Sequence, residues 1–488
     1  MSDVLRRVGV VMVGVVLVIV AVVLWRAVDV DSQQRAVEPV DVELDDPDGA
    51  VDRLSAALQI PTISPAETDE ERRAFVELRE LVASEFPIID NVAEHHRSSE
   101  LTMHLELPGV VDEAPHVVFL AHADVVPVES GTADEWSYPP FSGAVEEGYI
   151  WGRGTLDNKH NMMALLEAVE GMLAGGERPD HTVHLVFGHD EEVGGLDGAR
   201  RVAQSMEDRQ LDVAAVYDEG LVITEGLVPG VEGPIGLIGI GEKGYLTVEI
   251  TARAEGGHAS MPPQHLAVNR LSRALEAIDD DPAPAAVDGA IEEMFRWSVS
   301  EMDVVHRMIF RNLWLFEPLV LSQMADAPST NAAVRTTSSP TMLRASDREN
   351  VLPQRAVATV NLRIDPRDSI DGVIERIEAR IDDDEVSVQA VGEMRSEPSP
   401  QASIEGPEFE AITTAAGEVF GDMPVAPGLV VAATDSRHFT ELTDDIYRFS
   451  PVVHDERDLE RIHGTDERIA VDAYLDLIRY YDRLLRQW

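Results

Sequence analysis

Short apolar runs and longer amphipathic stretches alternate along this chain, and each kind predicts a different element. Continuous apolar runs predict strands buried on both faces, whereas apolar residues spaced three or four apart predict helices with one buried face. The predicted strands are 101–107, 116–121, 181–187 and 213–217. The predicted helices are 51–58, 68–85, 162–174 and 198–207. This order predicts an α/β fold whose mixed, mostly parallel sheet is flanked by helices.

The pattern changes after residue 244. Residues 245–395 alternate in the order β-α-β-β-α-β, which predicts an inserted ferredoxin-like α+β domain with an open-faced sheet. An apolar helical segment at about 282–327 interrupts this domain. From 396 to 488 the pattern of the first domain resumes. We therefore expect a main domain built from residues 46–244 and 396–488, with the inserted domain between its two parts.

The N-terminal segment, 1–27, is separate from both domains. Its unbroken apolar run, 8–25, is about the minimum length that crosses a bilayer, and it exceeds a typical signal-peptide core. Arg6 and Arg7 precede the run, which favours a cytoplasmic N-terminus. We expect an uncleaved transmembrane signal anchor that holds the main domain outside the cytoplasm; a cleaved signal peptide is the alternative. Residues 28–45 are polar and acidic, and are expected to form a linker.

Charge narrows the possible functions. The chain has 39 basic and 90 acidic residues, a net charge of −51, so a nucleic-acid partner is not expected. The acids are scattered, which fits either an ordinary solvated surface or adaptation to high salt. There is no cysteine, which excludes disulfides, thiolate metal sites and thiol nucleophiles.

Several acids and histidines follow the apolar runs. His122 and Asp124 end one predicted strand on the same face, which suits a histidine metal ligand with a carboxylate behind it. Asp157 follows a glycine turn and is either a carboxylate bridging two metal ions or a helix N-cap. In isolation, such residues are most often ordinary polar positions entering a loop.

Asp190, Glu191 and Glu192 are consecutive acids after another buried run, and they would repel one another without a nearby cation. Adjacent glutamates are not expected to point the same way, so one can bind metal while its neighbour faces water. A solvated acidic loop is the alternative. Asp218 ends a further apolar run, and His463 lies near the C-terminus.

Together these residues offer only nitrogen and oxygen ligands. The candidate metal ligands are His122, Asp157, Glu192, Asp218 and His463. A shared carboxylate in such a set suits two zinc ions, with cobalt or manganese as substitutes. Glu191 is the candidate general base and His258 the candidate donor to a developing oxyanion. Taken singly, histidines such as His258 and His463 are more often structural loop residues.

The motifs resemble, in order, those of the dizinc metallopeptidase family that includes aminoacylase, glutamate carboxypeptidase and carboxypeptidase S. The matching pieces are His122-Ala-Asp124, Gly152-Arg-Gly-Thr-Leu-Asp157, Asp190-Glu-Glu-Val-Gly-Gly195, Asp218-Glu-Gly, Gly257-His258-Ala-Ser, Asn350-Val-Leu-Pro353, Arg363 and His463-Gly. They span roughly residues 50–470, and as a set they are highly specific.

The resemblance implies a role for each matched residue. It implies that one zinc is bound by His122, Asp157 and Asp218. It implies that the second zinc is bound by Asp157, Glu192 and His463. Asp124 would support His122, and Glu191 would be the base. The inserted domain would be a lid that commonly dimerises, so that His258 of one subunit completes the partner's site. Asn350 and Arg363 match lid positions that contact a substrate carboxylate.

The anchor, the lid insertion and the phrase Arg448-Phe-Ser-Pro451 most resemble the carboxypeptidase S branch. We expect release of a C-terminal amino acid from a peptide; the alternative substrate is an N-fatty-acyl amino acid. A non-catalytic binding protein on the same fold is less favoured, because the base and all five ligands are present. Apolar Trp314, Leu315 and Phe316 are candidates for an acyl-chain site, a lid core or a dimer contact.

Overall fold

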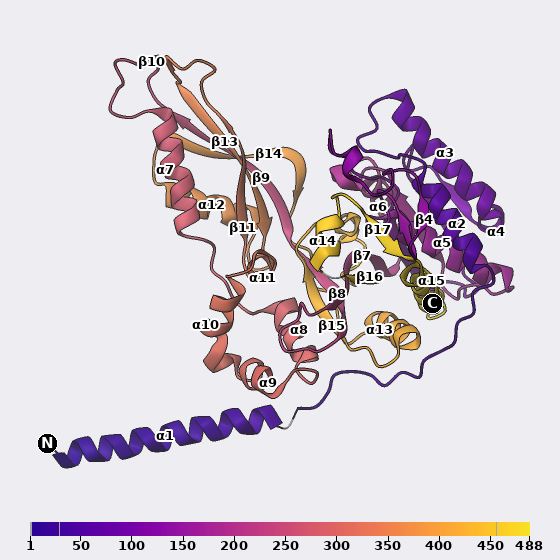
Figure 1. The fold of residues 1–488 in the computed structure, drawn as a ribbon, viewed down its shortest axis with the longest axis horizontal. Coiled ribbons are helices and arrows are strands. Elements are labelled where there is room, and N and C mark those ends of the chain that lie inside the picture. The colour runs from indigo at the N-terminus through magenta and orange to yellow at the C-terminus, as the bar shows by residue number, and fades with distance from the viewer. Residues whose placement is uncertain (1, 29, 455) are drawn as a thin grey trace.

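A mixed eight-stranded sheet forms the centre of the larger domain in the computed structural model, which describes residues 2–28, 30–454 and 456–488 (Figure 1). Its order is β1-β2-β6-β3-β7-β16-β8-β15. The strands are β1 (Glu94–His96), β2 (Met103–Leu107), β3 (His116–His122), β6 (Val183–Gly188), β7 (Val213–Glu225), β8 (Pro234–Glu242), β15 (Val425–Val430) and β16 (Ile446–His454). The four central strands β6, β3, β7 and β16 are mutually parallel, which confirms the predicted class.

Side chains of β3 alternate between two cores, as a strand covered on both faces requires. Val117 and Phe119 belong to the core that includes residues of α2, α5 and α15, while Val118 and Leu120 face α6. The helices of the larger domain are α2 (Pro47–Leu58), α3 (Asp69–Glu85), α4 (Pro87–Val92), α5 (Lys159–Ala174), α6 (Ala199–Asp208), α13 (Pro407–Phe420), α14 (Glu456–Arg461) and α15 (Val471–Leu485). The continuous apolar run of β3 is therefore explained by burial on both faces.

The inserted domain has the ferredoxin-like arrangement. Its antiparallel sheet has the order β11-β13-β9-β14. The elements are β9 (Gly244–Arg253), α7 (Ala267–Asp280), β11 (Thr337–Arg344), β13 (Arg355–Ile364), α12 (Ile370–Ile381) and β14 (Val386–Ser396). The two helices and one sheet face enclose a separate core, which includes Leu246, Val248 and Val360. At the tip, β10 (Gly257–His258) pairs with β12 (Val351–Leu352).

The helical insertion packs on the larger domain rather than forming a core with the lid. Its helices are α8 (Gly289–Ser298), α9 (Val304–Phe310), α10 (Leu313–Met324) and α11 (Pro328–Ala333). Phe295 and Trp297 of α8 are buried in the main core, and the Trp297 ring meets Phe409 edge to face at 5.4 Å. Trp314 of α10 is exposed, so it contributes to no lid core.

The N-terminal helix α1 (Ser2–Val28) is long and apolar enough to cross a membrane. Its window Leu5–Val28 has a mean hydropathy of 3.1 and is 6% buried. Residues 30–46 form no helix or strand, yet they lie along the main domain rather than acting as a free tether. Gln34 exchanges two hydrogen bonds with the backbone of Val425, and the Val40 amide donates to the Glu418 carbonyl.

Candidate metal centre and active site

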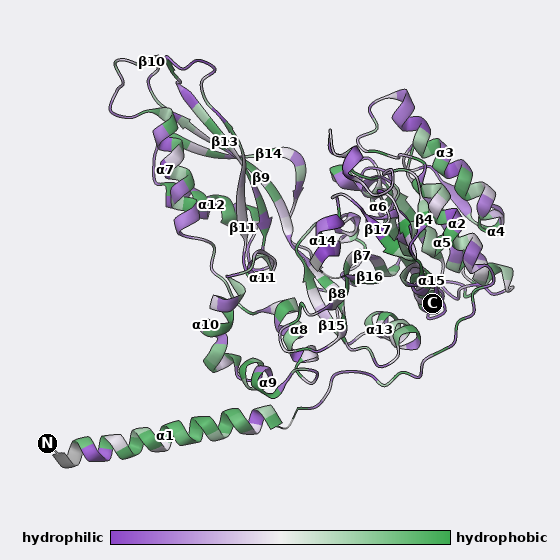
Figure 2. Ribbon diagram, viewed as in Figure 1, coloured by the Kyte–Doolittle hydropathy of each residue, from purple (hydrophilic) through white to green (hydrophobic). Residues whose placement is uncertain are grey.

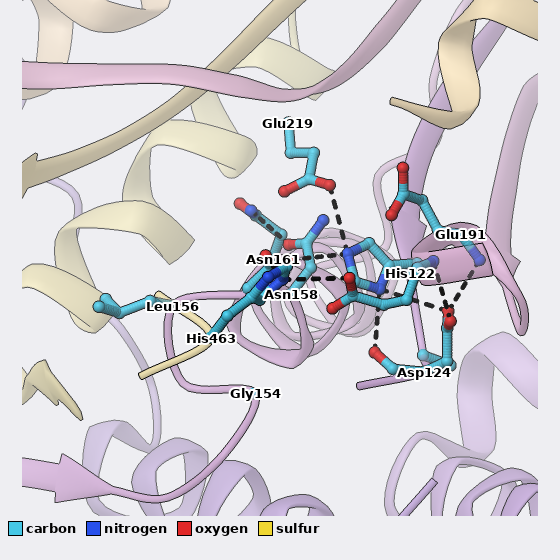
Figure 3. A network of polar contacts seen from close by, with 12 residues as sticks. His122, Asp124, Gly154, Leu156, Asn158, Asn161, Glu191, Glu219 and His463 are labelled. Atoms are coloured by element: carbon cyan, nitrogen blue, oxygen red, sulfur yellow. Dashed lines mark hydrogen bonds and ion pairs between the residues drawn. The ribbon is translucent and has the colours of Figure 1, made fainter. Parts of the chain in front are cut away.

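The candidate side chains converge beyond the carboxyl ends of β3 and β6, where sites form in parallel sheets. His122 is the last residue of β3, and Glu191 begins the short 3-10 helix (Glu191–Val193) that follows β6. Asp157 lies just before α5, with a cis peptide bond to Asn158. His463 follows α14, and Glu219 of β7 completes the group. Figure 3 shows how side chains so distant in sequence meet.

The Asp157 carboxylate lies between two histidines. Its Oδ1 is 2.8 Å from His122 Nε2, and its Oδ2 is 3.0 Å from His463 Nε2. Glu219 Oε1 is 3.3 Å from the same nitrogen of His122, and Glu192 Oε2 is 3.1 Å from that of His463. Two groups of three potential donors therefore share Asp157, and within each group the donor atoms lie within 4.8 Å of one another.

The tautomer of His122 follows from its neighbours. Its Nδ1 lies 2.9 Å from the backbone carbonyl oxygen of Asp124, which can only accept, so Nδ1 carries the hydrogen. In a neutral imidazole the lone pair of Nε2 then faces oxygens of Asp157 and Glu219. This arrangement requires a cation, either a proton on the ring or a metal ion between the donors.

The pKa values of the clustered histidines and of Glu219 are raised, which also indicates an excess of negative charge. Burial opposes charging of His122, but Glu219, Asp124 and Asp157 together raise its pKa well above the usual value. Hydrogen bonds with Asp157 and Glu192 raise the pKa of His463 to about 10. Burial and the charge of Asp157 raise the pKa of Glu219 to about 7. The cluster thus holds negative charge that a divalent cation would neutralise.

The position taken by Glu219 is the one that the sequence analysis gave to Asp218. The Asp218 carboxylate instead accepts hydrogen bonds from the backbone amides of Ser436, at 2.9 Å, and Glu219, at 2.8 Å. Strand β7 does not end at residue 217 but continues to Glu225, and its pairing with β16 is irregular between Asp218 and Leu221. The donor group around His122 thus contains Glu219 rather than Asp218 among the described residues.

Asp124 orients more than His122. Its Oδ2 accepts from Ser64 Oγ at 2.6 Å and from the Glu192 amide at 3.2 Å, while its Oδ1 accepts from the Glu191 amide at 3.2 Å. A single buried carboxylate thus ties the end of β3 to the turn that carries both glutamates. Figure 3 shows Asp124 in contact with His122 and Glu191, with Glu219 approaching His122 from another side.

Glu191, whose side chain is 10% exposed, lies beside the cluster without belonging to either donor group. Burial raises its pKa well above the usual value, and nearby Asp435 and Glu219 add to this, although His122 and Arg437 oppose it. Its Oε1 lies 4.0 Å from Arg437 Nη2. A buried carboxylate with a raised pKa can accept and return a proton, as a general base requires.

Arg153 and Glu467 fix the two loops that bring Asp157 and His463 together, and the sequence analysis assigned neither a role. Arg153 Nη1 donates to Glu467 Oε2 at 2.5 Å, and its Nη2 donates to the carbonyl of His463 at 3.0 Å. Glu467 Oε1 accepts from the backbone amides of Gly154 and Leu156. Spacing in the sequence could not reveal this pair, because the partners are 314 residues apart.

The donor set fits divalent metal ions. It contains imidazole nitrogens and carboxylate oxygens, the ligands zinc uses where no thiolate is present. Glu192 Oε1 is buried and has no hydrogen-bond partner among the described residues, although Oε2 of the same carboxylate faces His463. A buried carboxylate oxygen left in this way is explained by a cation that completes its coordination.

Two predicted lid residues do not reach this cluster within one chain. His258 is exposed at the lid tip, where its Nδ1 lies 2.8 Å from Ser260 Oγ. Asn350 is also exposed, and its carbonyl accepts from the Ala259 amide at 3.1 Å. Figure 1 shows β10, which contains His258, at the end of the lid domain far from β7 and β16.

Arg363, by contrast, lies at the end of β13 close to Arg437 and Glu191. Its guanidinium stacks over the Tyr245 ring at 4.6 Å, and burial together with the charge of Arg437 lowers its pKa. A cavity of about 150 Å³ separates the lid strands from the loop after Glu192. Its lining residues are Gly194, Leu196, Tyr245, Met394, Arg395, Ser396, Arg437 and His438. The cavity is therefore bordered by arginines.

Residues 118–487 match peptidase family M20/M25/M40. The chain belongs to this family. It is 34% identical over 440 residues to the N-fatty-acyl-amino acid synthase/hydrolase PM20D1 of Xenopus tropicalis, covering 89% of this chain and 85% of the relative. It is 33% identical over 439 residues to the probable carboxypeptidase S-like 2 of Dictyostelium discoideum, covering 89% and 84%. Carboxypeptidase S of Saccharomyces cerevisiae is 26% identical over 497 residues, covering 90% and 85%.

Solved structures agree with the fold of this M20 chain. The M20 family metallo-carboxypeptidase Sso-CP2 from Sulfolobus solfataricus has a TM-score of 0.65 at 19% identity, covering 90% of this chain and 98% of that one. Human carnosine dipeptidase 1 has a TM-score of 0.64 at 16% identity, covering 91% and 96%. The chain is thus a metallohydrolase of the M20 family, and the expected family and enzyme class are confirmed.

Replacement of Arg153 by methionine should lower both stability and activity. Removing one partner of a buried ion pair costs about 3–5 kcal/mol, and here it also frees the loops carrying Asp157 and His463. Urea unfolding and kcat/KM would measure the two effects. The matched control is Arg201→Met, which breaks an exposed pair with Asp197 and should cost less than about 1 kcal/mol. Equal losses in both variants would contradict the assigned role.

Proposed function

We propose that this M20 enzyme hydrolyses an amide bond next to a free carboxylate and releases a C-terminal amino acid from a peptide. The observation that carries the proposal is the Asp157 carboxylate shared by two donor groups, with Glu191 buried beside them. A second candidate substrate is an N-fatty-acyl amino acid. The similarity to PM20D1 favours it, and the same bond type is broken in both cases.

We propose two zinc ions, with cobalt or manganese as substitutes. One would be held by His122, Asp157 and Glu219, and the other by Asp157, Glu192 and His463. Bound there, the ions would supply Lewis-acid activation of water and of the scissile carbonyl. Asp124 holds the His122 ring so that Nε2 points into the cluster, and the Arg153–Glu467 pair keeps Asp157 and His463 within reach of each other.

Glu191 is the proposed general base. It would take one proton from the attacking water, whose oxygen bonds to the carbonyl carbon, and would deliver that proton to the leaving amine as the carbon–nitrogen bond breaks. Its burial raises the affinity of the carboxylate for a proton, which suits temporary storage between the two transfers. The Asp124 carboxylate accepts a hydrogen bond from the Glu191 amide, which holds the backbone of the proposed base in position.

Arg437 and Arg363 are the proposed partners of the substrate carboxylate. Arg437 Nη2 is buried with no hydrogen-bond partner among the described residues, though it lies 4.0 Å from Glu191. Arg363 is stacked on Tyr245, which leaves its edge available for hydrogen bonds. Guanidinium groups bind carboxylates through paired hydrogen bonds, so an anion beside the base would satisfy these donors.

We propose that a second copy of the chain contributes the remaining lid residues. His258 and Asn350 lie together at the exposed lid tip, remote from the cluster of their own chain. In a lid-mediated dimer, His258 of the partner subunit would donate to the developing oxyanion, and Asn350 of the partner subunit would contact the substrate carboxylate. This arrangement gives the exposed tip a function that a single chain does not provide.

We further propose that α1 is an uncleaved signal anchor with the catalytic domain outside the cytoplasm. Its apolar run, 8–25, and the preceding Arg6 and Arg7 support this orientation. A cleaved signal peptide remains the alternative. The high-salt interpretation of the −51 charge stays a prediction, and maximal stability in dilute buffer would contradict it.

Replacement of Glu191 by glutamine should abolish turnover while metal content stays unchanged. Loss of a general base costs about 10²–10⁴-fold in kcat, and the amide keeps the size of the side chain. Single-turnover kinetics and elemental analysis of the same preparation would measure both quantities. In a companion experiment, a chelator should remove the metal ions from the wild type and thereby abolish its activity. Substantial activity in Glu191→Gln would refute the proposed base.

A matched pair of acid-to-amide variants tests the third ligand. Glu219→Gln should lower the bound metal from two ions toward one, because a carboxylate facing His122 is lost. Asp218→Asn should retain both ions but lower the unfolding midpoint, because asparagine has one oxygen for the amides of Ser436 and Glu219. Elemental analysis and urea unfolding give the readouts. The reverse metal pattern would reinstate Asp218 as the ligand.

Substrate preference separates the two candidate functions. Leucine release from a blocked Gly-Leu dipeptide should exceed release from N-oleoyl-leucine in kcat/KM, measured on the zinc-loaded full chain. For both acyl groups, the free acid should be preferred over leucinamide at least about tenfold, because Arg437 and Arg363 pair with the carboxylate. Preference for the oleoyl substrate would favour the second candidate, and equal cleavage of acid and amide would contradict the carboxylate site.

A further inference from the structure

The helical insertion carries exposed apolar side chains on helices α9 and α10. The exposed fractions are 63% for Val304, 61% for Val305, 56% for Trp314, 40% for Leu315 and 56% for Leu319. We call these five residues the apolar platform. A water-facing surface of this kind marks a contact with another molecule or with a membrane.

The platform belongs to a firmly packed part of the main domain. Val320 and Met324, on the opposite side of α10, are buried in the main core. Helix α8 of the same insertion packs against β15 at the edge of the central sheet. The apolar face is therefore held in place by the fold, and whatever covers it would orient the whole catalytic domain.

The platform lies beside the end of the candidate membrane span. Asn312, between α9 and α10, donates from Nδ2 to the carbonyl of Val23 at 3.3 Å, and Arg311 Nε donates to the carbonyl of Arg26 at 3.5 Å. Val23 and Ala27 are buried in this contact, whereas most of α1 is exposed. The insertion thus contacts the last two turns of α1, where a spanning helix would leave the bilayer.

Charge along α9 and α10 differs from charge elsewhere in the chain. Residues 304–324 contain one acid, Glu317, and two arginines, Arg307 and Arg311, in a chain whose acids outnumber its basic residues by more than two to one. Acid-rich surfaces are repelled by anionic lipid headgroups, whereas a segment that contains one acid and two arginines is repelled less. The local composition therefore suits contact with a lipid surface.

We propose that the apolar platform inserts into the membrane interface next to α1. Trp314 and the exposed Trp25 of α1 would then lie at headgroup level, where tryptophan is enriched. Figure 2 shows that α1, α9 and α10 are all largely apolar along their length. The proposal rests on the proposed anchoring by α1 and adds a second contact that fixes the tilt of the catalytic domain.

The arrangement of the domains is compatible with this contact. Figure 1 shows α1 running away from the body on the side of α9 and α10, with the lid domain standing off from it. Membrane helices are usually inclined, on average by about 20° from the bilayer normal. An inclined α1 brings α9 and α10 to the bilayer surface and leaves the lid tip, with His258, in water.

The chain has no cysteine, so single-cysteine variants of the full protein can be spin-labelled without background changes. Three sites are compared in proteoliposomes, using collision with oxygen or with a nickel chelate supplied on both sides. Leu319→Cys reports the platform and Val15→Cys reports α1. Val110→Cys is the control, because Val110 is similarly exposed, at 57%, on a loop remote from the insertion. Hydrolysis of a soluble substrate verifies the fold of each variant.

We expect labels at 319 and 15 to collide preferentially with oxygen and the label at 110 with the nickel chelate. A lipid-embedded label at 15 with a water-exposed label at 319 would overturn the platform proposal while leaving the anchor intact. A water-exposed label at 15 would instead overturn the anchor and, with it, the platform. Protection at 319 with spin–spin coupling between chains would mean that a second copy covers the face, which would also overturn the proposal.

Discussion

The central constraint on this protein is the Asp157 carboxylate, whose two oxygens each face a histidine while two further carboxylates approach from either side. Buried negative charges so close together are unstable unless positive charge lies between them. The surrounding residues hold the donor side chains in position but do not supply that positive charge. Asp124 sets the tautomer of His122, and the Arg153–Glu467 pair joins the loops that carry Asp157 and His463.

The two domains divide the work around this centre. Parallel strands bring the donors to one edge of the main sheet. Strand β13 of the inserted domain brings Arg363 near Arg437 and Glu191. The lid tip, with His258, stays exposed. The two donor groups are thus built within one chain, whereas His258 of the same chain does not reach them. The helical insertion, although interrupting the lid sequence, joins the core of the main domain.

Sequence motifs predicted the donor residues that directly follow a buried strand or a glycine turn. His122, Asp157 and Glu192 were identified because a buried strand or a glycine turn delivers them to a sheet edge, and the structure brings all three together. The sequence analysis named Asp218 as a ligand, whereas the structure places Glu219 beside His122. The sequence offered two adjacent acids after an apolar run, and only the folded path of β7 shows which of them lies beside His122.

The sequence by itself determined the α/β class, the inserted ferredoxin-like domain and the family, because hydrophobic periodicity and local motifs depend on short stretches of chain. It also named four of the five residues that form the two donor groups. Only the tertiary structure decided which acid completes the His122 group, that Arg153 pairs with Glu467, and that the apolar insertion lies beside α1. These features depend on strand register and on contacts between segments hundreds of residues apart, and neither leaves a local pattern in the sequence.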